Sequence, residues 1–255
     1  KQKSTLPDSV EHNYVSGNTI LHGEKAQNKF DSPALKTGFT TTKKFNHAYS
    51  TDVQTNADKT EGKFDGVEQQ LRQSWVASNS NITALCQAFK RPFIMGVNPL
   101  MPKNTVLLIG SESRGKVKAV SEMCALLKQR KLLKYTGVST VSFERYPTSS
   151  EDELFLSDLY KALYSQSEAI VFENIDKANF RCLNIVFQLI KNGTYHLTKR
   201  YVLQNNMLVD STGMLNTTAI SELNTNGKYF VFTSTCSVEK VTEFIGNEFA
   251  RLIND

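Results

Sequence analysis

From residue 105 onward, short apolar runs alternate with longer segments whose apolar residues recur at helical spacing. The short runs predict strands and the longer segments predict helices. Strands are expected at 105–109, 138–143, 169–174 and 229–234, and helices at 116–131, 151–164 and 180–192. Strands that alternate with helices form a parallel sheet with helices on both faces. The pattern therefore predicts an α/β fold.

The first part of the chain has a different pattern. Residues 1–65 are rich in Lys, Thr, Asn and Ser and show no sustained period, which predicts an extended arm or linker. A helical stripe then begins, and its members are expected in the core: Leu71, Trp75, Ile82, Leu85, Ala88 and Phe89. Residues 91–102 are predicted to be a connection. The chain thus divides into a polar arm, 1–65, and an α/β domain, 66–255.

A glycine-containing loop directly follows the first predicted strand. It consists of Gly110, Ser111, Glu112, Ser113, Arg114, Gly115 and Lys116. Two glycines let backbone N–H groups turn toward phosphate oxygens, and the lysine supplies a cation for the outer phosphates. In such loops the next residue is Ser or Thr, whose hydroxyl ligates Mg²⁺, but here it is Val117. The segment predicts a phosphate-binding loop that lacks this metal ligand. The alternative is a glycine turn before an ordinary helix.

The strand predicted at 169–174 ends in Glu173 and Asn174. In a P-loop nucleotidase the corresponding strand ends in an Asp that holds the Mg²⁺ ion, followed by a residue that activates water. Glu173 keeps a carboxylate and is the candidate metal-contacting residue. Asn174 cannot accept a proton, so it cannot be a general base. Asp176 is a candidate replacement base, and its position also suits the turn that opens the next helix.

The stretch from residue 169 to residue 193 is similar to one family without a gap. After the strand the chain reads Asn174-Ile-Asp-Lys-Ala178, and the following helix carries Asn184 and Gln188 before Gly193. This order resembles the Clp family of AAA+ unfoldases and disaggregases. Their acidic strand runs into an Ile-Glu-Lys-Ala-like turn, and then into a helix with Asn and Gln before an Asp-Gly-like stop.

The resemblance continues toward the end of the chain. The strand 229–234 corresponds to a family strand that ends in Thr-Ser-Asn, whose Asn senses the terminal phosphate, and this chain has Thr235 at that point. The segment Glu248-Phe-Ala-Arg251 corresponds to the one that carries the family's arginine finger, with Arg251 one residue early. The resemblance therefore covers residues 66–255.

The resemblance implies the large subdomain of an AAA+ ATPase, a three-layer αβα P-loop fold with a parallel sheet. The family's small helical lid would begin where the chain stops, at Asp255. It also implies ATP or ADP with Mg²⁺, an oligomeric ring and protein clients. Val117, Asn174 and Thr235 remove a metal ligand, a base and a phosphate sensor. Because one such loss costs about two to four orders of magnitude in rate, we expect a degenerate module that binds nucleotide and hydrolyses it weakly or not at all.

Two further functions remain open: a pseudo-ATPase that serves as a protein-interaction platform, and a nucleic-acid-handling AAA+ protein. In place of the family's glycine-flanked pore loop the chain has Tyr146-Pro-Thr-Ser-Ser-Glu-Asp, which predicts a plain turn, with Tyr146 as a candidate gripping residue. The interval 194–228 is longer than in the family. A short hairpin is expected at 195–210, and the candidates for one face are Tyr201, Leu203, Met207 and Val209.

The composition bears on whether the chain binds nucleic acid or spans a membrane. The chain has 255 residues, 40% hydrophobic and 22% charged, with a net charge of +5. The basic residues are spread along the chain. Several of those between 118 and 134 are expected on the outer face or in the last turn of the helix after the glycine loop, which argues against nucleic acid. No apolar run approaches the roughly 20 residues that span a bilayer, and no signal peptide is visible.

The cysteines and histidines show no sign of a metal site. The four cysteines, which lie in separate apolar segments and have no metal-ligand spacing, are Cys86, Cys124, Cys182 and Cys236. They predict reduced core residues of a cytoplasmic protein. The four histidines likewise show no pattern typical of a metal site.

Overall fold

The computed structural model describes residues 62–75, 79–111, 113–213 and 218–253. Nearly all of the predicted arm, 1–65, lies outside the described residues, as does Glu112 of the glycine loop. For Ser113 and Arg114 the backbone alone is described. In the described part, no helix is both long and apolar enough to cross a membrane.

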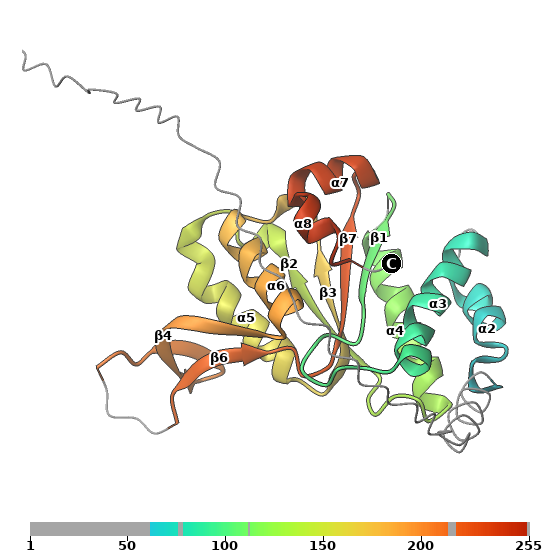
Figure 1. Ribbon diagram of the computed structural model, residues 1–255, viewed down its shortest axis with the longest axis horizontal. Coiled ribbons are helices and arrows are strands. Elements are labelled where there is room, and N and C mark those ends of the chain that lie inside the picture. Colours follow the sequence, from blue (N-terminus) through green and yellow to red (C-terminus); the bar gives the residue numbers. More distant parts are fainter. Residues whose placement is uncertain (1–61, 76–78, 112, 214–217, 254–255) are drawn as a thin grey trace, which may run out of the picture. The chain divides into compact units, whose positions relative to one another are not determined.

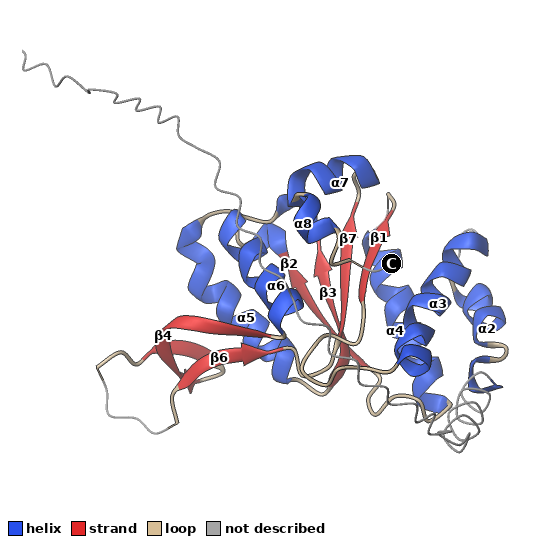
Figure 2. Ribbon diagram, in the orientation of Figure 1, coloured by secondary structure: helices blue, strands red, loops and turns tan. Residues whose placement is uncertain are grey.

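The domain is an α/β fold built around a four-stranded parallel sheet with the strand order β1-β7-β3-β2 (Figure 1; Figure 2). The strands are β1 Thr105–Ile109, β2 Gly137–Ser142, β3 Ser167–Glu173 and β7 Tyr229–Ser234. All four strands predicted for this sheet are confirmed. The two central strands, β3 and β7, are buried on both faces. This double burial explains why they read as continuous apolar runs.

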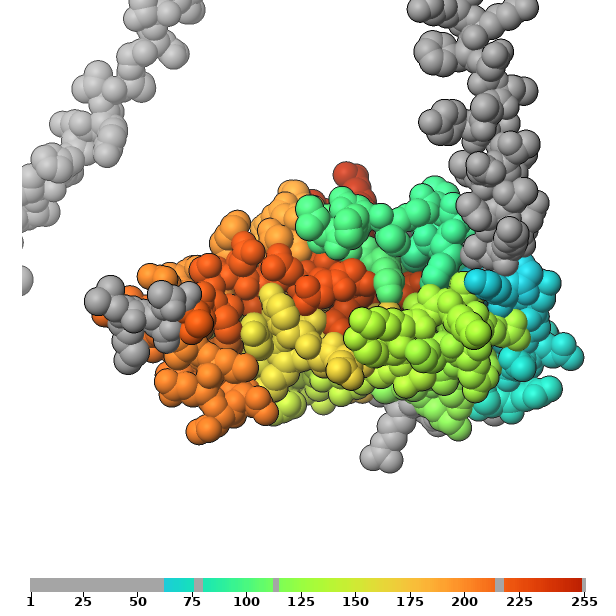
Figure 3. Space-filling model, turned by 90° about the horizontal axis from the view of Figure 1, so that it is seen from below, coloured from blue at the N-terminus to red at the C-terminus, as the bar shows by residue number. Residues whose placement is uncertain are grey.

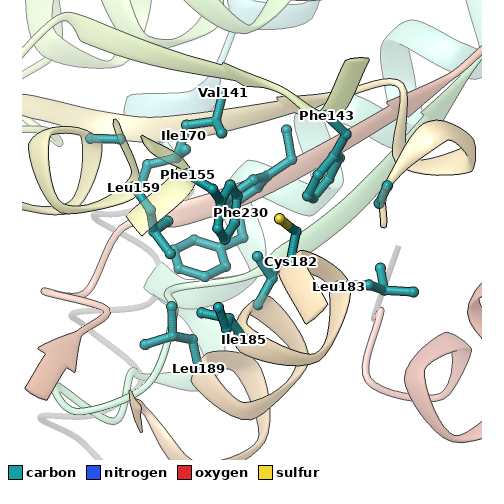
Figure 4. Close-up of a cluster of buried hydrophobic side chains, with 14 of the residues drawn as sticks. Val141, Phe143, Phe155, Leu159, Ile170, Cys182, Leu183, Ile185, Leu189 and Phe230 are labelled. Atoms are coloured by element: carbon teal, nitrogen blue, oxygen red, sulfur yellow. The ribbon is translucent and has the colours of Figure 1, made fainter. Parts of the chain in front are cut away.

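Helices cover both faces of this sheet. Their bounds are α2 Val67–Ser74, α3 Asn79–Met95, α4 Ser113–Gln129, α5 Asp152–Tyr164, α6 Phe180–Asn192, α7 Val238–Ile245 and α8 Asn247–Ala250. Helices α2, α3 and α4 pack with Val171 and Val231 of the sheet. On the other face, α5 to α8 pack with Phe172 and Phe230, in the cluster of Figure 4. The predicted layers are therefore present.

Helix α3 corrects one prediction, because it continues through Pro92 to Met95 where a connection was expected from residue 91. A proline inside a helix deprives the carbonyl four residues earlier of its N–H donor. That carbonyl belongs to Ala88, and it accepts a hydrogen bond of 2.8 Å from the Asn104 side chain. The carbonyl of Phe89 accepts one of 2.9 Å from the Tyr229 hydroxyl. Asn104 thus replaces the bond that Pro92 removes, and Tyr229 adds a second bond from the sheet to α3.

The interval 194–228 contains a second, antiparallel sheet with the order β5-β4-β6. Its strands are β4 Thr194–Gln204, β5 Met207–Asp210 and β6 Ile220–Asn224, and β6 was not predicted. The predicted hairpin is β4–β5, whose two-residue turn places Asn205 and Asn206 at positive φ, as a type I′ turn requires.

The predicted apolar face of this hairpin is wrong. Tyr201 is buried as expected, but Leu203, Met207 and Val209 are 40–47% exposed, and Leu208 is buried instead. The strand register explains the error for Met207 and Val209, because the pairing Leu203↔Leu208 places these two residues on the face opposite to Tyr201. Leu203 lies on the face of Tyr201, next to the turn, and is nevertheless exposed.

Tyr146, the candidate gripping residue, lies inside the domain. Tyr146 is fully buried, and its hydroxyl donates to Asp158 at 2.7 Å, so this side chain does not project to grip a substrate.

All four cysteines are free thiols. Cys86, Cys124 and Cys182 are buried as predicted, whereas Cys236 is partly exposed. Cys236 differs because it follows β7, at the edge of the sheet.

A buried carboxylate anchors the start of β3. Glu168 Oε2 accepts from Lys103 Nζ at 2.6 Å, and Oε1 accepts from the backbone N–H groups of Lys134 and Tyr135, each at 2.8 Å. Burial alone raises the pKa of the Glu168 carboxyl, but the hydrogen bonds from Lys103 and the two N–H groups outweigh it and hold this pKa below its usual range. The folded state therefore favours the ionised form of Glu168.

This carboxylate predicts a pH dependence of stability. Because the folded-state pKa is lowered, the contribution of Glu168 is fully present above the unfolded-state pKa of about 4.3 and is lost as the pH falls through the folded-state pKa. We expect Glu168→Gln to lower the free energy of unfolding by about 2 kcal/mol at neutral pH. Urea unfolding from pH 7 downward should show the difference between the variant and the unsubstituted protein shrinking in acid. A constant difference would contradict the assignment.

Candidate functional site at the carboxyl edge of the parallel sheet

Three predicted site segments meet at one edge of the sheet, because β1, β3 and β7 are parallel and their carboxyl ends lie together. Ile109 pairs with Ser234 at the ends of β1 and β7, and the N–H of Gly110 donates to the Ser234 carbonyl at 3.2 Å. The glycine loop follows β1, Glu173 ends β3, and Thr235 follows β7. This is the edge at which open α/β sheets bind ligands.

The glycine loop is shorter than predicted, because α4 begins at Ser113 and not at residue 116. Gly115 and Lys116 therefore lie in the first turn of the helix. The first four N–H groups of a helix have no partner within it. Together with the helix dipole they favour an anion at this end of α4.

The side chain of Lys116 folds back over this loop. It is 95% buried, since 5% of its surface is exposed, and its Nζ donates to the Gly110 carbonyl at 2.5 Å. Val117 points elsewhere: it is partly buried and packs with the core cluster of α2, α3 and α4. The apolar contact explains why an aliphatic residue is stable at position 117, where phosphate-binding loops carry a metal-binding hydroxyl.

Two predicted site residues, Glu173 and Asn174, lie at the end of β3. Glu173 is partly buried, and burial first, then the nearby Glu144, raises the pKa of its carboxyl. Asn174 has φ 58° and ψ 54°, the left-handed conformation that Asn tolerates better than most residues. The local backbone thus supplies a structural reason for Asn at this position. Among the described residues, no group of three or more His, Cys, Asp or Glu side chains is placed to hold a metal ion.

Asp176 lies in a short 3₁₀ turn, Ile175–Lys177, and connects two of the strands. Its carboxylate accepts a hydrogen bond from the Ser234 hydroxyl and lies 3.6 Å from Cys236 Sγ. The N–H of Cys236 donates to Ser234 Oγ at 2.9 Å. Asp176 therefore ties the segment after β3 to the end of β7, in addition to the turn role that its sequence position suggested.

The last two predicted residues lie on the surface. Thr235 is exposed directly after β7, beside the Asp176 cluster. Arg251 is exposed at the end of α8. The carbonyl of the next residue, Leu252, accepts from the Thr105 hydroxyl at 2.6 Å, at the amino end of β1. The backbone directly after Arg251 is therefore held at the amino end of β1, away from the glycine loop.

A cleft of about 450 Å³ extends from Lys116 along the outer side of β1. It lies between α3 and α7, with the segment after α8 at its side. Its lining is mostly apolar and includes Trp75, Leu107, Val238 and Ile245. The volume falls within the range of small-molecule sites. The helical stripe predicts Trp75 in the core, but this side chain is only partly buried and contributes to the cleft.

The fold and the site define an α/β protein whose parallel sheet is compatible with a Rossmann-like or a P-loop architecture. No protein-family model matches the chain, and no curated protein matches it significantly.

Proposed function

We propose that this domain is an ATP-binding module of the P-loop class, similar to the AAA+ ATPases of the Clp family, that hydrolyses ATP weakly or not at all. One observation carries the proposal. A strand, a glycine turn and a helix place a buried lysine beside a cleft at the carboxyl edge of a parallel sheet. A ligand with an anionic group and an apolar ring fits this arrangement, because the anion meets the lysine and the ring enters the apolar cleft.

The residues present fit a nucleotide in the following way. The phosphates lie at the start of α4, where N–H groups and the helix dipole favour negative charge. Lys116 Nζ, which donates to the Gly110 carbonyl at 2.5 Å, exchanges this acceptor for a phosphate oxygen. The adenine lies in the apolar cleft, where Trp75 contributes an aromatic surface.

The residues present do not fit a dedicated Mg²⁺ site. Val117 has no side-chain oxygen and packs in the core. Glu173 ends β3 with Glu144 nearby, but among the described residues these carboxylates are not part of a group of three or more metal-ligating side chains. Asn174 supplies no base, and Thr235 replaces the family's phosphate-sensing Asn. We therefore propose that nucleotide binding, and not turnover, is the activity of this module, within a larger oligomeric assembly that remodels proteins in the cytoplasm.

Calorimetric titration with ATP and ADP, with and without Mg²⁺, tests this proposal. We expect both nucleotides to bind with little dependence on Mg²⁺, and Lys116→Ala to weaken binding about tenfold or more, because it removes a charge-assisted bond to phosphate. Lys118→Ala is the matched control, since Lys118 lies on the same helix with its side chain 64% exposed. Equal affinities for the unsubstituted protein and Lys116→Ala, or no binding at all, would contradict the proposal.

The second candidate function is a pseudo-ATPase that serves as a protein-interaction platform. A specific observation favours it: large apolar side chains are exposed at Ile94, Met95, Val97 and Leu100. Nucleotide titration separates the two functions, because a platform does not require the Lys116 site.

A further inference from the structure

Four large apolar side chains are exposed in one short segment at the end of α3 and just beyond it. The exposed fractions are 48% for Ile94, 79% for Met95, 51% for Val97 and 67% for Leu100. Single exposed apolar residues are ordinary on protein surfaces, but a contiguous group indicates an interaction site. We call this group the 94–100 segment.

Hydrogen bonds hold the backbone of this segment in place. The Leu100 carbonyl accepts from the Thr225 hydroxyl at 2.9 Å, and the Met101 N–H donates to the Asn98 carbonyl at 3.0 Å. The Lys103 N–H donates to the Lys228 carbonyl at 2.9 Å. The backbone from residue 98 to residue 103 is therefore held in place, and Ile94 and Met95 lie in the last turn of α3. Side chains on an ordered backbone lose less entropy on binding a partner.

A cavity of about 500 Å³ lies beside the 94–100 segment, at the amino edge of the parallel sheet. Val97 and Pro99 line it on one side, and Tyr135 and Tyr164 contribute aromatic rings. Figure 3 looks onto this side of the domain, where the chain around residues 95–103 lies close to the chain around 163–168 and 225–228. The cavity is on the edge opposite to Lys116, so it is distinct from the proposed nucleotide site.

The charge of this cavity is positive. Lys103, Lys134 and Lys228 line it, and among the described residues that line it Glu168 is the one acidic residue. Glu168 already accepts from Lys103 and from two backbone N–H groups. Lys228 is directed inward, with Nζ 2.9 Å from the Ser165 carbonyl after α5, where it offsets the negative end of that helix. Lys134 is exposed and is the cation best placed to meet a ligand.

We propose that the 94–100 segment and this cavity together form a docking surface for an acidic peptide segment of a partner protein that carries large apolar residues. The apolar residues of the peptide contact Met95, Val97 and Leu100, and its carboxylates lie near Lys134 and Lys103. Charge complementarity selects an acidic partner, and the concave pocket suits a peptide better than a flat bilayer surface.

Fluorescence anisotropy with labelled peptides tests this surface on the full chain. The probes are peptides of about 12 residues that alternate glutamate with leucine or phenylalanine, and matched peptides with glutamine in place of glutamate. We expect the acidic peptides to bind about tenfold or more tightly than the glutamine peptides at low salt, and this preference to shrink as salt increases.

Two substitutions separate the apolar and the charged contributions. Leu100→Ser is expected to weaken binding of the acidic peptide about tenfold and to leave the salt dependence unchanged, because it removes apolar contact alone. Lys134→Gln is expected to weaken binding and also to reduce the salt dependence. Met207→Ser and Lys240→Gln are the matched controls, since both residues are exposed on other elements.

Three results would overturn the proposal. The first is equal binding of the glutamic acid and glutamine peptides, or no binding of either. The second is unchanged binding in Leu100→Ser and Lys134→Gln. The third is sedimentation with phosphatidylserine vesicles in the absence of any peptide binding, which would identify a membrane surface instead. Because the comparison of the two peptides uses the unsubstituted protein, a folding defect in a variant does not affect it.

Discussion

Gly193→Ala is expected to lower the free energy of unfolding by about 3 kcal/mol or more, through strain and steric overlap together. Gly193 ends α6 with φ 75° and ψ −17°, a left-handed conformation that costs other residues about 1 to 2 kcal/mol. A Cβ atom there would also overlap the Leu100 carbonyl oxygen and lie 2.9 Å from its carbon. The Leu100 backbone cannot easily move away, because Thr225 holds its carbonyl.

A second glycine with nearly the same backbone conformation separates the two effects. Gly66 precedes α2 with φ 72° and ψ −1°, and the nearest atom to a Cβ there is in the flexible side chain of Arg130, at 3.7 Å. Gly66→Ala is therefore expected to cost about 1 kcal/mol, from the conformation alone. Urea unfolding of both variants measures the difference. Equal losses of stability would show that the overlap with Leu100 is relieved at no cost.

Gly193 also belongs to the stretch that resembles the Clp family. The order of Asn184, Gln188 and Gly193 contributed to the resemblance to the Clp family. The structure gives Gly193 a local cause that requires no family, since the end of α6 packs directly against the backbone at Leu100. Gly193 therefore does not by itself support the resemblance.

The sheet could be predicted because its information is local. Each central strand is a short apolar run between polar turns, and burial on both faces leaves little ambiguity about its type. The continuation of α3 through Pro92 could not be predicted, because it depends on Asn104, a donor that reaches Ala88 only in the folded chain. The face of the hairpin was missed for a similar reason, since its register depends on the Asn205-Asn206 turn.

Part of the candidate site could likewise be predicted from the sequence, and part of it could not. Parallel strands place the glycine loop, Glu173 and Thr235 at one edge, so their proximity could be anticipated from strand order. The cleft beside Lys116 could not, because it depends on how α7 and the segment after α8 pack next to β1. The directions of side chains were also beyond the sequence pattern. Val117 and Lys116 are neighbours in the chain, yet Val117 packs in the core while Lys116 bends back to Gly110.

The aromatic packing behind the site leads to the second large effect. Phe172 is fully buried on β3, directly before Glu173, and its ring lies 5.2 Å from the ring of Phe230 and 5.2 Å from that of Phe232. The ring of Phe143, at 6.0 Å, closes the other side. These rings connect β3 to β7 and to the turn after β2, which fixes the carboxyl ends of the strands.

Phe172→Ala is expected to lower the free energy of unfolding by about 3 to 5 kcal/mol, because the cavity it leaves is bordered by rings on neighbouring strands that cannot collapse into it. Phe180→Ala is the matched control: the same side chain is removed from a position that is 83% exposed, so a change within about 0.5 kcal/mol is expected. Thermal and urea unfolding of both variants measure the effect. A small loss for Phe172→Ala would mean that β3 and β7 can move together, and the carboxyl edge would then be less rigid than this packing implies.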